Sequence, residues 1–402
     1  MIILKTIFYF LQVWIAIYLL LPLFFLLVYW IKKGLRRQYT IAHKRPVIEK
    51  DFDFAAIITA HKDLTLIPPL VDSFCRQTYR NFTVYVVADA CDISGLHFED
   101  ERVIILKPEK ELGAKIRSID YAINHFVRPH EVLVIFDSDN LVHPEYMHVL
   151  NLYYQQGFRA VQTNLQAKNK DNLYSRLDTI GNTFYNFTER EMRMELGLSS
   201  AIWGLGISLE TSLYKEIIYQ HFLGGFDKRI QADIVRKIPQ LAFAKEAIVY
   251  DEKITDAAAM ERQRTRWIHA QFKYFNLGWE VLVAGIRKLN FNVAFFGFMN
   301  LRPPLFLVMG MAFLFVLINL FINPLSALIW SAVIVVFVIS FFLIISAKTN
   351  DKKLLSTVFY MPLFILRQVF ALLKMGKANK SFLKTEHTKI VFIEDLLKNE
   401  PV

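Results

Sequence analysis

VLVIFDSDNLVHPEY, residues 132–146, runs from a continuous apolar segment into a cluster of polar residues. The apolar run has the length and composition of a β-strand that is buried on both faces, as in a parallel sheet. Asp137 and Asp139 follow it directly and are separated by one serine. Two carboxylates this close raise each other's cost of ionising unless solvent or a cation compensates them. The stretch therefore predicts a strand whose end is either a solvated turn or a cation site.

Three further apolar runs precede this strand, at residues 54–60, 82–89 and 102–106. The stretches 66–77, 112–126 and 143–156 are predicted helices, and the first and last of them carry proline near their start. Alternation of strands and helices predicts an α/β fold with an open, mostly parallel sheet and helices on both faces. Ligands of such sheets bind beyond the carboxyl ends of the strands.

Polar residues gather at these predicted strand ends: Thr59, His61 and Lys62 after the first run, Asp89 and Asp92 after the second. With Asp137 and Asp139 they offer oxygen ligands of the kind that Mg²⁺ or Mn²⁺ prefers, without the Cys/His set that suits zinc. Asp-Ser-Asp-Asn is also ordinary turn and helix-capping chemistry, so a solvated turn stays open as the alternative. The sequence carries neither a dinucleotide-binding fingerprint nor a P-loop.

The composition predicts a chain that is partly in a membrane and partly in water, because 54% of its 402 residues are hydrophobic while 21% are charged. The net charge of +10 suits an anionic membrane surface or phosphate-bearing ligands. It suits nucleic acid less well, since much of the basic excess flanks the apolar segments, and we expect no nucleic-acid partner. With Cys75 and Cys91 as the only cysteines, we expect no disulfide framework.

Three apolar segments are long enough to cross a bilayer: residues 7–31, 304–322 and 325–347. The first is followed by a basic stretch, residues 32–45, which belongs on the cytoplasmic side. Residues 354–374 are also apolar but are interrupted by Arg367 and Gln368, and we predict an interfacial helix there, with a fourth crossing as the alternative. We therefore expect a multi-pass protein of the cell inner (cytoplasmic) membrane, in which the segment between the first span and about residue 290 is cytoplasmic.

A helix is predicted within residues 250–271, where Gln263, Arg266 and Trp267 share one face. A guanidinium suits a diphosphate and an indole suits the apolar face of a sugar ring. A basic amphipathic helix resting on the membrane would look similar. Lys115, in ELGAKIRS (111–118), is either a phosphate contact or an ordinary residue at a helix start.

Together these motifs resemble the membrane-bound glycosyltransferases of family 2, which include the synthases of cellulose, hyaluronan and poly-N-acetylglucosamine. The chain reads Q-x-x-R-W at residues 263–267, downstream of D-x-D and flanked by membrane segments. Other stretches similar to that family are IITAHKD (57–63), VVADACD (86–92), GAKIRSIDYAI (113–123), FDSDNLVHPEYM (136–147) and GGFDKRIQADI (224–234). The similarity runs from about residue 54 to 270 and implies a GT-A type fold and a hexosyltransferase.

The resemblance also implies roles for individual residues. Those implied to bind the nucleotide-sugar donor, with a UDP-sugar favoured, are Thr59, His61, Asp89, Lys115, Asp137, Gln263 and Arg266. Asp139, together with Asp137, would hold Mg²⁺ or Mn²⁺ on the diphosphate. Trp203, Gly204 and Trp267 would contact a saccharide or lipid-linked acceptor. The product would be extracellular or cell-surface polysaccharide, and a homo-oligomer or other polysaccharide-export proteins are candidate partners.

The general base departs from the family pattern, because Gln231-Ala232-Asp233 stands where the family usually has Thr-Glu-Asp. We predict Asp233 as the base and expect a helix to begin there, with Asp227 as the alternative residue. A carboxylate at a helix terminus needs no catalytic role at all. An inactive, membrane-anchored protein that binds nucleotide sugars or serves as a scaffold is therefore the alternative function, and the retained D-x-D and Q-x-x-R-W motifs argue against it.

The expected organisation has five parts. They are an N-terminal transmembrane helix and basic linker (1–47), a cytoplasmic GT-A glycosyltransferase domain (48–275), an interfacial segment (276–303), a transmembrane hairpin (304–347), and an interfacial helix with a basic tail (348–402).

Overall fold

A computed structural model describes residues 2–35, 49–218, 226–373 and 389–398. Within these residues, the globular half of the molecule is built on an eight-stranded sheet in the order β3-β2-β1-β4-β7-β6-β8-β5. The strands are β1 (Phe54–His61), β2 (Phe82–Asp89), β3 (Val103–Leu106), β4 (Val132–Asp137), β5 (Leu141–Val142), β6 (Ala160–Ala167), β7 (Ile207–Glu210) and β8 (Ala242–Asp251). The predicted strands are β1 to β4, and β5 to β8 extend the sheet beyond them.

Strand direction decides where the polar strand ends meet. β1 to β4 run parallel to one another. β7 lies between β4 and β6 and is antiparallel to both, so β6 runs in the same direction as β4. β8 is parallel to β6 and therefore also runs in that direction. Among the described strands only β5 and β7 run the opposite way. The mostly parallel sheet is therefore confirmed. His61, Asp89, Asp137 and Asp251 end their strands at one edge of it.

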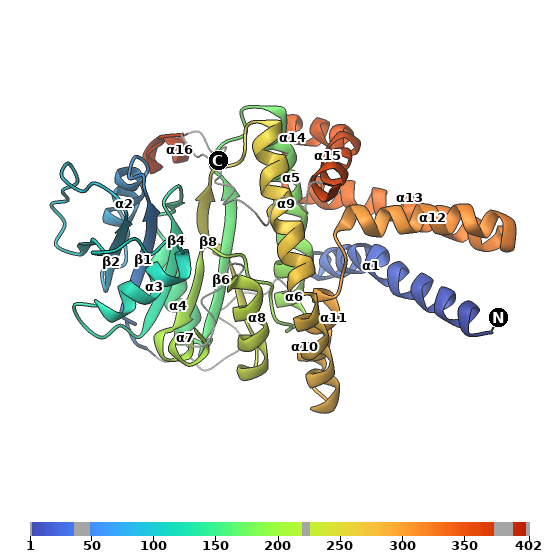
Figure 1. The fold of residues 1–402 in the computed structure, drawn as a ribbon, viewed down its shortest axis with the longest axis horizontal. Coiled ribbons are helices and arrows are strands. Elements are labelled where there is room, and N and C mark those ends of the chain that lie inside the picture. The colour runs from blue at the N-terminus through green and yellow to red at the C-terminus, as the bar shows by residue number, and fades with distance from the viewer. Residues whose placement is uncertain (1, 36–48, 219–225, 374–388, 399–402) are drawn as a thin grey trace.

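Helices cover both faces of the sheet, as predicted (Figure 1). α2 (Ile67–Cys75) and α4 (Tyr146–Gln155) pack on one face, and α3 (Lys115–Asn124), α7 (Thr211–Ile218) and α8 (Phe226–Lys237) pack on the other. The strands between them are almost wholly buried, with every residue of β2 buried. A strand buried on both faces cannot alternate polar and apolar residues, which explains the continuous apolar runs in the sequence.

A second group of helices lies between the sheet and the membrane segments (Figure 1). It contains α5 (Leu173–Asn186), the π-helical turn η2 (Phe187–Glu191), α6 (Met192–Glu195), α9 (Ala257–Lys273), α10 (Phe275–Arg287) and α11 (Phe291–Asn300). α10 and α11 form a close pair, because Gly285 and Gly297 let the backbones touch: a Cβ at either glycine would lie 2.2 Å from a backbone nitrogen of the facing helix. This pair packs against α8 through Ala232 and Val235.

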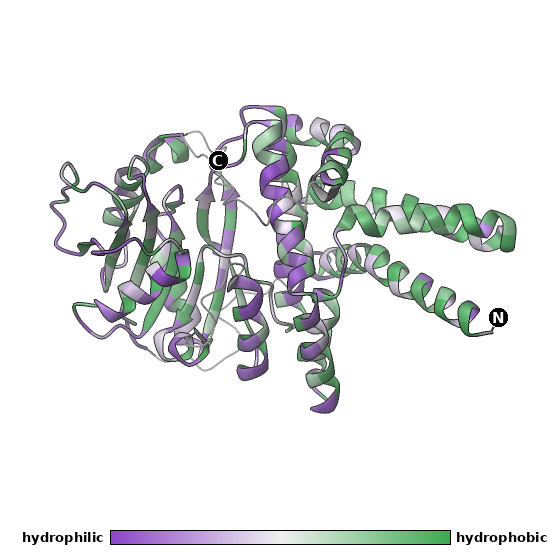
Figure 2. Cartoon of the chain, viewed as in Figure 1, coloured by the Kyte–Doolittle hydropathy of each residue, from purple (hydrophilic) through white to green (hydrophobic). Residues whose placement is uncertain are grey.

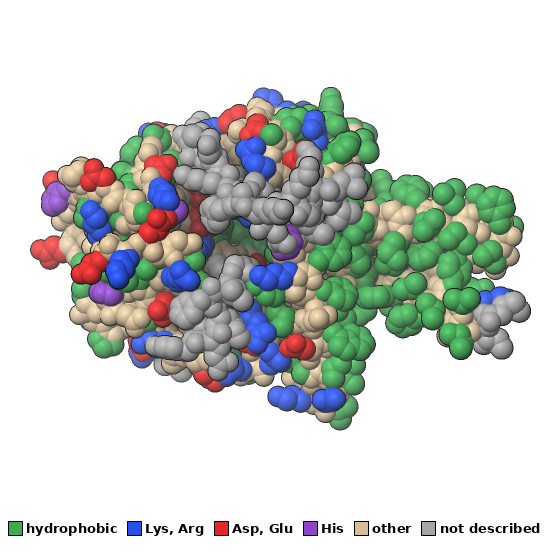
Figure 3. Space-filling view, viewed as in Figure 1, with side chains coloured by type: hydrophobic (Ala, Val, Ile, Leu, Met, Phe, Trp, Pro, Cys, Tyr) green, Lys and Arg blue, Asp and Glu red, His purple; other side chains and the backbone are tan. Residues whose placement is uncertain are grey.

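The membrane segments form long apolar helices that project from the globular half. α1 (Ile2–Gly34), α12 (Leu305–Ile322) and α13 (Pro324–Lys348) correspond to the three predicted spans, and Pro22 lies inside α1 without ending it. Figure 2 shows these helices as almost uniformly hydrophobic, and Figure 3 shows hydrophobic side chains covering them while charged side chains cover the sheet. By length and composition, four stretches among the described residues could cross a membrane: these three and Lys352–Phe370.

The fourth stretch is made of three short elements, α14 (Lys352–Thr357), η3 (Val358–Tyr360) and α15 (Met361–Leu373). α15 packs against α9 and buries Phe364, while Phe359, Leu366 and Phe370 remain more than half exposed. One apolar face thus lies on the globular half and another is open, which suits the predicted interfacial position without testing it.

The chain returns to the sheet at its end. α16 (Ile393–Lys398) buries Ile393 against Leu141 and Tyr250. The predicted basic tail, residues 374–384, and most of the predicted basic linker, residues 36–45, lie outside the described residues.

Candidate active site

Three of the predicted site residues meet at the carboxyl end of β4. The ammonium of Lys115, the first residue of α3, donates to Asp137 Oδ1 at 2.6 Å and to the carbonyl oxygen of Gly204 at 2.7 Å. Asp137 keeps 40% of its side chain exposed beside this contact. A lysine, a carboxylate and a loop carbonyl therefore share one partly open position where a ligand can reach them.

The loop before α3 is held in place by Asp89. Its two carboxylate oxygens accept hydrogen bonds from the backbone N–H groups of Leu112 and Gly113, at 2.7 and 2.9 Å. Gly113 has φ +62°, a left-handed conformation that glycine adopts without strain. His61 Nε2 lies 2.8 Å from Glu111 Oε1 in the same loop. Asp89 and His61 thus fix the loop that places Lys115, and their predicted donor contacts stay predictions.

Thr59 belongs to the same edge of the sheet. Its hydroxyl donates to the carbonyl oxygen of Phe136 at 3.3 Å, one residue before Asp137. It therefore ties β1 to the end of β4, and its predicted contact with the donor stays a prediction.

Asp139 points into a different environment from Asp137. It is 5% exposed, and the buried ammonium of Lys168 donates to its carbonyl oxygen at 3.1 Å. The side-chain amide of Asn140 lies 3.5 Å from Asp139 Oδ1 and 3.4 Å from Asp251 Oδ1. Burial lowers the pKa of Lys168, and the negative charge of Asp139 opposes that shift. The two aspartates therefore have different surroundings: Asp137 is partly open beside Lys115, and Asp139 is buried beside Asn140.

Asp137 and Asp139 offer only oxygen donors, which fits Mg²⁺ or Mn²⁺ rather than zinc. Nowhere in the described residues do three or more His, Cys, Asp or Glu side chains gather as a metal-binding group. The protein would therefore supply part of a coordination shell, and diphosphate oxygens and water the remainder, which is how Mg²⁺ is usually held at nucleotides.

α9 (Ala257–Lys273) carries the Q-x-x-R-W motif. Asp256 caps the helix by accepting from the N–H groups of Ala258 and Ala259, both at 2.9 Å. Arg266 is solvent-exposed but lies close enough to Asp137 for the two charges to interact: partial burial lowers the pKa of Arg266, and Asp137 opposes the shift. Arg266 therefore lies within electrostatic range of the Asp137 carboxylate that Lys115 contacts.

The other two residues of the motif differ in exposure. Gln263 Oε1 is buried and has no hydrogen-bond partner among the described residues. Trp267 is 45% exposed, and the guanidinium of Arg264 lies 4.4 Å from its ring centroid. An unpaired amide oxygen and an open indole face are features that a bound ligand can use, although neither identifies one.

The loop that contains Trp203 and Gly204 is fixed from several sides. The Trp203 N–H donates to Gln162 Oε1 at 2.8 Å, and the Ile202 N–H donates to Gln231 Oε1 at 3.2 Å. The buried guanidinium of Arg190 lies 3.7 Å from the centroid of the Trp203 ring, a cation–π distance. Trp203 is consequently held beside Gly204, whose carbonyl contacts Lys115.

Asp233 stands apart from these contacts. α8 begins at Phe226, so the prediction that a helix begins at Asp233 is wrong: the residue lies well inside the helix. Its carboxylate pairs with Arg229 at 3.3 Å and with Arg236, both on its own helix. The alternative base, Asp227, lies in the first turn of α8. The interactions of the described residues join neither carboxylate to Asp137 or Arg266.

Several site residues were not predicted from the sequence, namely Gln162, Lys168, Gln231 and Asp251. Lys168 and Asp251 lie at the ends of the parallel strands β6 and β8, so the reasoning that selected Asp137 would have found them had these strands been recognised. Gln162 carried a weaker signal, as a polar residue inside an otherwise apolar strand.

Comparison with known proteins agrees with this geometry. Residues 52–270 match the glycosyltransferase like family 2, which is more than half of the chain. Among solved structures, a mannosyltransferase from Pyrobaculum calidifontis, PcManGT in complex with GDP-Man and Mn²⁺, is similar over 91% of this chain and 99% of its own, with 15% identity and a TM-score of 0.54. S. aureus TarS 1–349 in complex with UDP-GlcNAc covers 60% of this chain and 89% of its own, with 12% identity and a TM-score of 0.38. No protein of curated function matches the chain.

The mostly parallel α/β sheet, the D-x-D turn at its carboxyl edge and the helix that carries Q-x-x-R-W together identify the protein as a glycosyltransferase. The chain belongs to glycosyltransferase family 2. The predicted family and enzyme class are thereby confirmed, and the helices α1, α12 and α13 associate it with a membrane.

Proposed function

We propose that this glycosyltransferase transfers a sugar, in one inverting step, from a nucleotide-sugar donor to a saccharide or lipid-linked acceptor at the cytoplasmic face of a membrane. The observation that carries the proposal is the contact of Lys115 with both Asp137 and the carbonyl oxygen of Gly204, with Arg266 within electrostatic range of Asp137. Two cations beside a carboxylate at the ligand-binding edge of an α/β sheet suit the diphosphate of such a donor.

The departing nucleoside diphosphate gains negative charge during the reaction. Lys115 and Arg266 would offset that charge, since Lys115 contacts Asp137, Arg266 lies within electrostatic range of it, and neither cation is wholly buried. Gln263 and Arg266 lie three residues apart on α9, so both can face the same diphosphate. A UDP-sugar remains the favoured donor. A GDP-sugar enters the proposal because the similar mannosyltransferase structure holds GDP-Man.

A divalent cation would be held by Asp139 and Asp137, whose oxygen-only donor set fits Mg²⁺ or Mn²⁺. When bound, it would neutralise part of the diphosphate charge. The mannosyltransferase structure with Mn²⁺ supports this proposal by likeness of fold. Lys168 donates to the backbone carbonyl oxygen of Asp139 and so helps to hold this turn in place.

For the acceptor hydroxyl, we propose Asp233 as the general base, which accepts the proton as the oxygen attacks the anomeric carbon. Because Arg229 and Arg236 pair with this carboxylate, Asp233 must release at least one of them before it can act. Trp203, Gly204 and Trp267 are the proposed acceptor contacts. The half-exposed indole of Trp267 suits stacking on a sugar ring.

The membrane arrangement fits an enzyme of surface polysaccharide synthesis. α1 and α13 both end in lysines, Lys32, Lys33 and Lys348, where they meet the globular half, and basic residues favour the cytoplasmic side. We therefore place the catalytic domain in the cytoplasm and the chain in the inner membrane. Homo-oligomers or other polysaccharide-export proteins are the proposed partners, because few helices are available within one chain to form a pore.

Release of nucleoside diphosphate from a panel of donors tests the proposal. Full-length protein in detergent is offered UDP- and GDP-sugars with Mn²⁺, with and without a membrane lipid extract as the acceptor source. Donor-specific release that the extract stimulates is expected. Absence of release from every donor, by protein that is folded by circular dichroism, would contradict the transfer function and favour a nucleotide-sugar-binding or scaffold role.

A further inference from the structure

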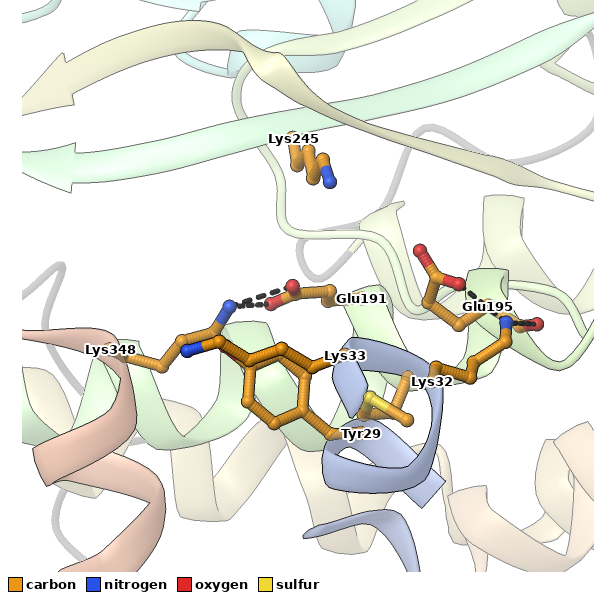
Figure 4. Close-up of a pocket in the computed structure, with 8 residues that line it drawn as sticks. Tyr29, Lys32, Lys33, Glu191, Glu195, Lys245 and Lys348 are labelled. Atoms are coloured by element: carbon orange, nitrogen blue, oxygen red, sulfur yellow. Dashed lines mark hydrogen bonds and ion pairs between the residues drawn. The ribbon is translucent and has the colours of Figure 1, made fainter. Parts of the chain in front are cut away.

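A polar cavity of about 170 Å³ lies where the membrane helices meet the globular half, away from the proposed active site (Figure 4). Its lining comes from the last turns of α1 and α13, from the η2–α6 segment and from β8. None of the residues assigned to sugar transfer lines it. The cavity therefore needs an explanation of its own.

The cavity carries an excess of positive charge. Four lysines line it, Lys32, Lys33, Lys245 and Lys348, against the two carboxylates of Glu191 and Glu195. Lys32 pairs with Glu195 at 2.5 Å and Lys348 with Glu191 at 2.6 Å, so each carboxylate is already neutralised by one lysine (Figure 4).

Two lysines of the lining are left over from these pairs. Lys33 lies 6.0 Å from the Tyr29 ring, and Lys245 has Glu246 at 3.8 Å, near the outer limit for an ion pair. Lysines beside a cavity are ready to bind an anion, because ammonium groups donate in several directions and attract negative charge at this range.

The position of the cavity indicates which kind of anion would bind there. Tyr29 lines it, and the neighbouring residues on the surface of α1, Trp30 and Ile31, expose 42% and 61% of their area. Aromatic and aliphatic residues followed directly by lysines are typical of a helix leaving the hydrocarbon region for the headgroup layer. In the proposed membrane placement of α1, the cavity lies at the depth of lipid phosphates, on the side that holds the globular half.

We propose that this cavity binds the phosphate of an anionic phospholipid headgroup. Lys33 and Lys245 contact the phosphate, while the Lys32–Glu195 and Lys348–Glu191 pairs keep α1 and α13 joined to the η2–α6 segment around it. The lipid would then bridge a membrane helix and strand β8 of the catalytic sheet. The inference uses the proposed membrane placement of α1 and α13 and is independent of the transfer reaction.

Native mass spectrometry of the full-length protein in detergent tests this site with phosphatidylglycerol and phosphatidylcholine as the probes. The unaltered protein should bind phosphatidylglycerol more tightly by about tenfold, since two lysines act on the anionic headgroup. Lys33→Gln combined with Lys245→Gln should remove that preference, and the corresponding Lys→Arg pair should restore it. Both variants leave the two ion pairs intact, so folding is expected to be retained.

Lys352→Gln combined with Lys353→Gln is the matched control, because these exposed lysines begin α14 directly after α13 and do not line the cavity. This control should keep the preference for phosphatidylglycerol. Equal loss in both glutamine pairs would show general surface attraction and overturn the site. Equal binding of the two lipids by the unaltered protein would also overturn the site. Displacement of phosphatidylglycerol by inorganic phosphate would overturn it as well, because the ligand would then be a soluble phosphate. Because none of these lipid-binding measurements requires sugar transfer, the test gives the same result even if the enzyme is inactive.

Discussion

Lys115 Nζ lies 2.6 Å from Asp137 Oδ1, which joins the first residue of α3 to the last residue of β4. The two residues are 22 positions apart in the chain, and the loop that brings them together is held by Asp89. This contact places a positive charge where the proposed donor diphosphate binds, so it is the first feature to test.

Lys115→Met should lower kcat/KM for the donor by about tenfold to a hundredfold, because a hydrogen bond to a charged group contributes about 1.5–3 kcal/mol. The methionine keeps most of the side-chain volume while removing the charge. Steady-state nucleoside diphosphate release measures the effect. Lys110→Met, at an exposed position in the preceding loop, is the control and should be active. An unchanged kcat/KM in Lys115→Met would remove the lysine from donor binding.

Metal dependence is expected to reside in the turn after β4. Treatment with EDTA should abolish release, and Mn²⁺ or Mg²⁺ should restore it. Asp139→Asn should weaken Mn²⁺ binding in the presence of nucleoside diphosphate by at least about tenfold, since a neutral amide replaces a hard anionic ligand. Electron paramagnetic resonance of Mn²⁺ gives the binding directly. Activity that survives EDTA, or Asp139→Asn with normal Mn²⁺ affinity, would contradict this role.

Asp233→Asn should reduce transfer by about a hundredfold or more while donor binding is retained, as expected for loss of a general base. Asp227→Asn is the paired variant, since it removes the alternative carboxylate from the same helix. Donor affinity is measured by calorimetry and transfer by product formation. Normal turnover in Asp233→Asn with loss in Asp227→Asn would move the base to the first turn of α8.

A stability prediction concerns the buried cluster beneath Trp203. Burial alone would raise the pKa of Glu189, but the guanidinium groups of Arg302, Arg193 and Arg190 outweigh it and hold the pKa at about 2, below the ordinary value of 4.5. Since the folded pKa is lowered, this carboxylate stabilises the fold above pH 4.5, and the contribution is lost as the pH falls toward 2.

Glu189→Gln should therefore destabilise the protein at neutral pH by about 3–5 kcal/mol, the usual cost of removing one partner from a buried charge pair. The loss of stability between pH 5 and 3 should become shallower than in the unaltered protein. Thermal unfolding in detergent at several pH values measures both effects. Glu216→Gln removes an exposed carboxylate paired with Lys237 and should change little. An equal effect of the two substitutions would mean that the cluster does not stabilise the fold.

Local sequence patterns were sufficient to predict the first four strands of the sheet and the membrane helices. β1, β2 and β4 are buried on both faces, so their apolar runs are continuous and easily recognised. β6 carries the polar residue Gln162 and is followed by Lys168, and the partners of both lie in distant segments. A strand pattern alone does not show that such polar residues have hydrogen-bond partners.

The helix with the proposed base shows the same limit. Asp233 was predicted to begin a helix, DIVRKI (233–238), yet α8 begins at Phe226 and continues through Asp233. Gln231 is accommodated inside the helix because its amide accepts from the Ile202 N–H, a contact across 29 residues. Local propensity cannot anticipate a partner of that kind.

The sequence by itself determined the α/β class, the membrane segments, the family and the presence of D-x-D and Q-x-x-R-W, because each of these depends on periodicity or on short-range spacing. Only the tertiary structure decided which of the residues share a position: Lys115 contacts both Asp137 and Gly204, Asp139 is buried beside Asn140, and Asp233 pairs within its own helix. The physical reason is that β7 inserts antiparallel between β4 and β6, which returns β6 and β8 to the direction of β4 and brings their ends to the same edge. That pairing is made by backbone hydrogen bonds between segments far apart in the chain, and no local pattern encodes it.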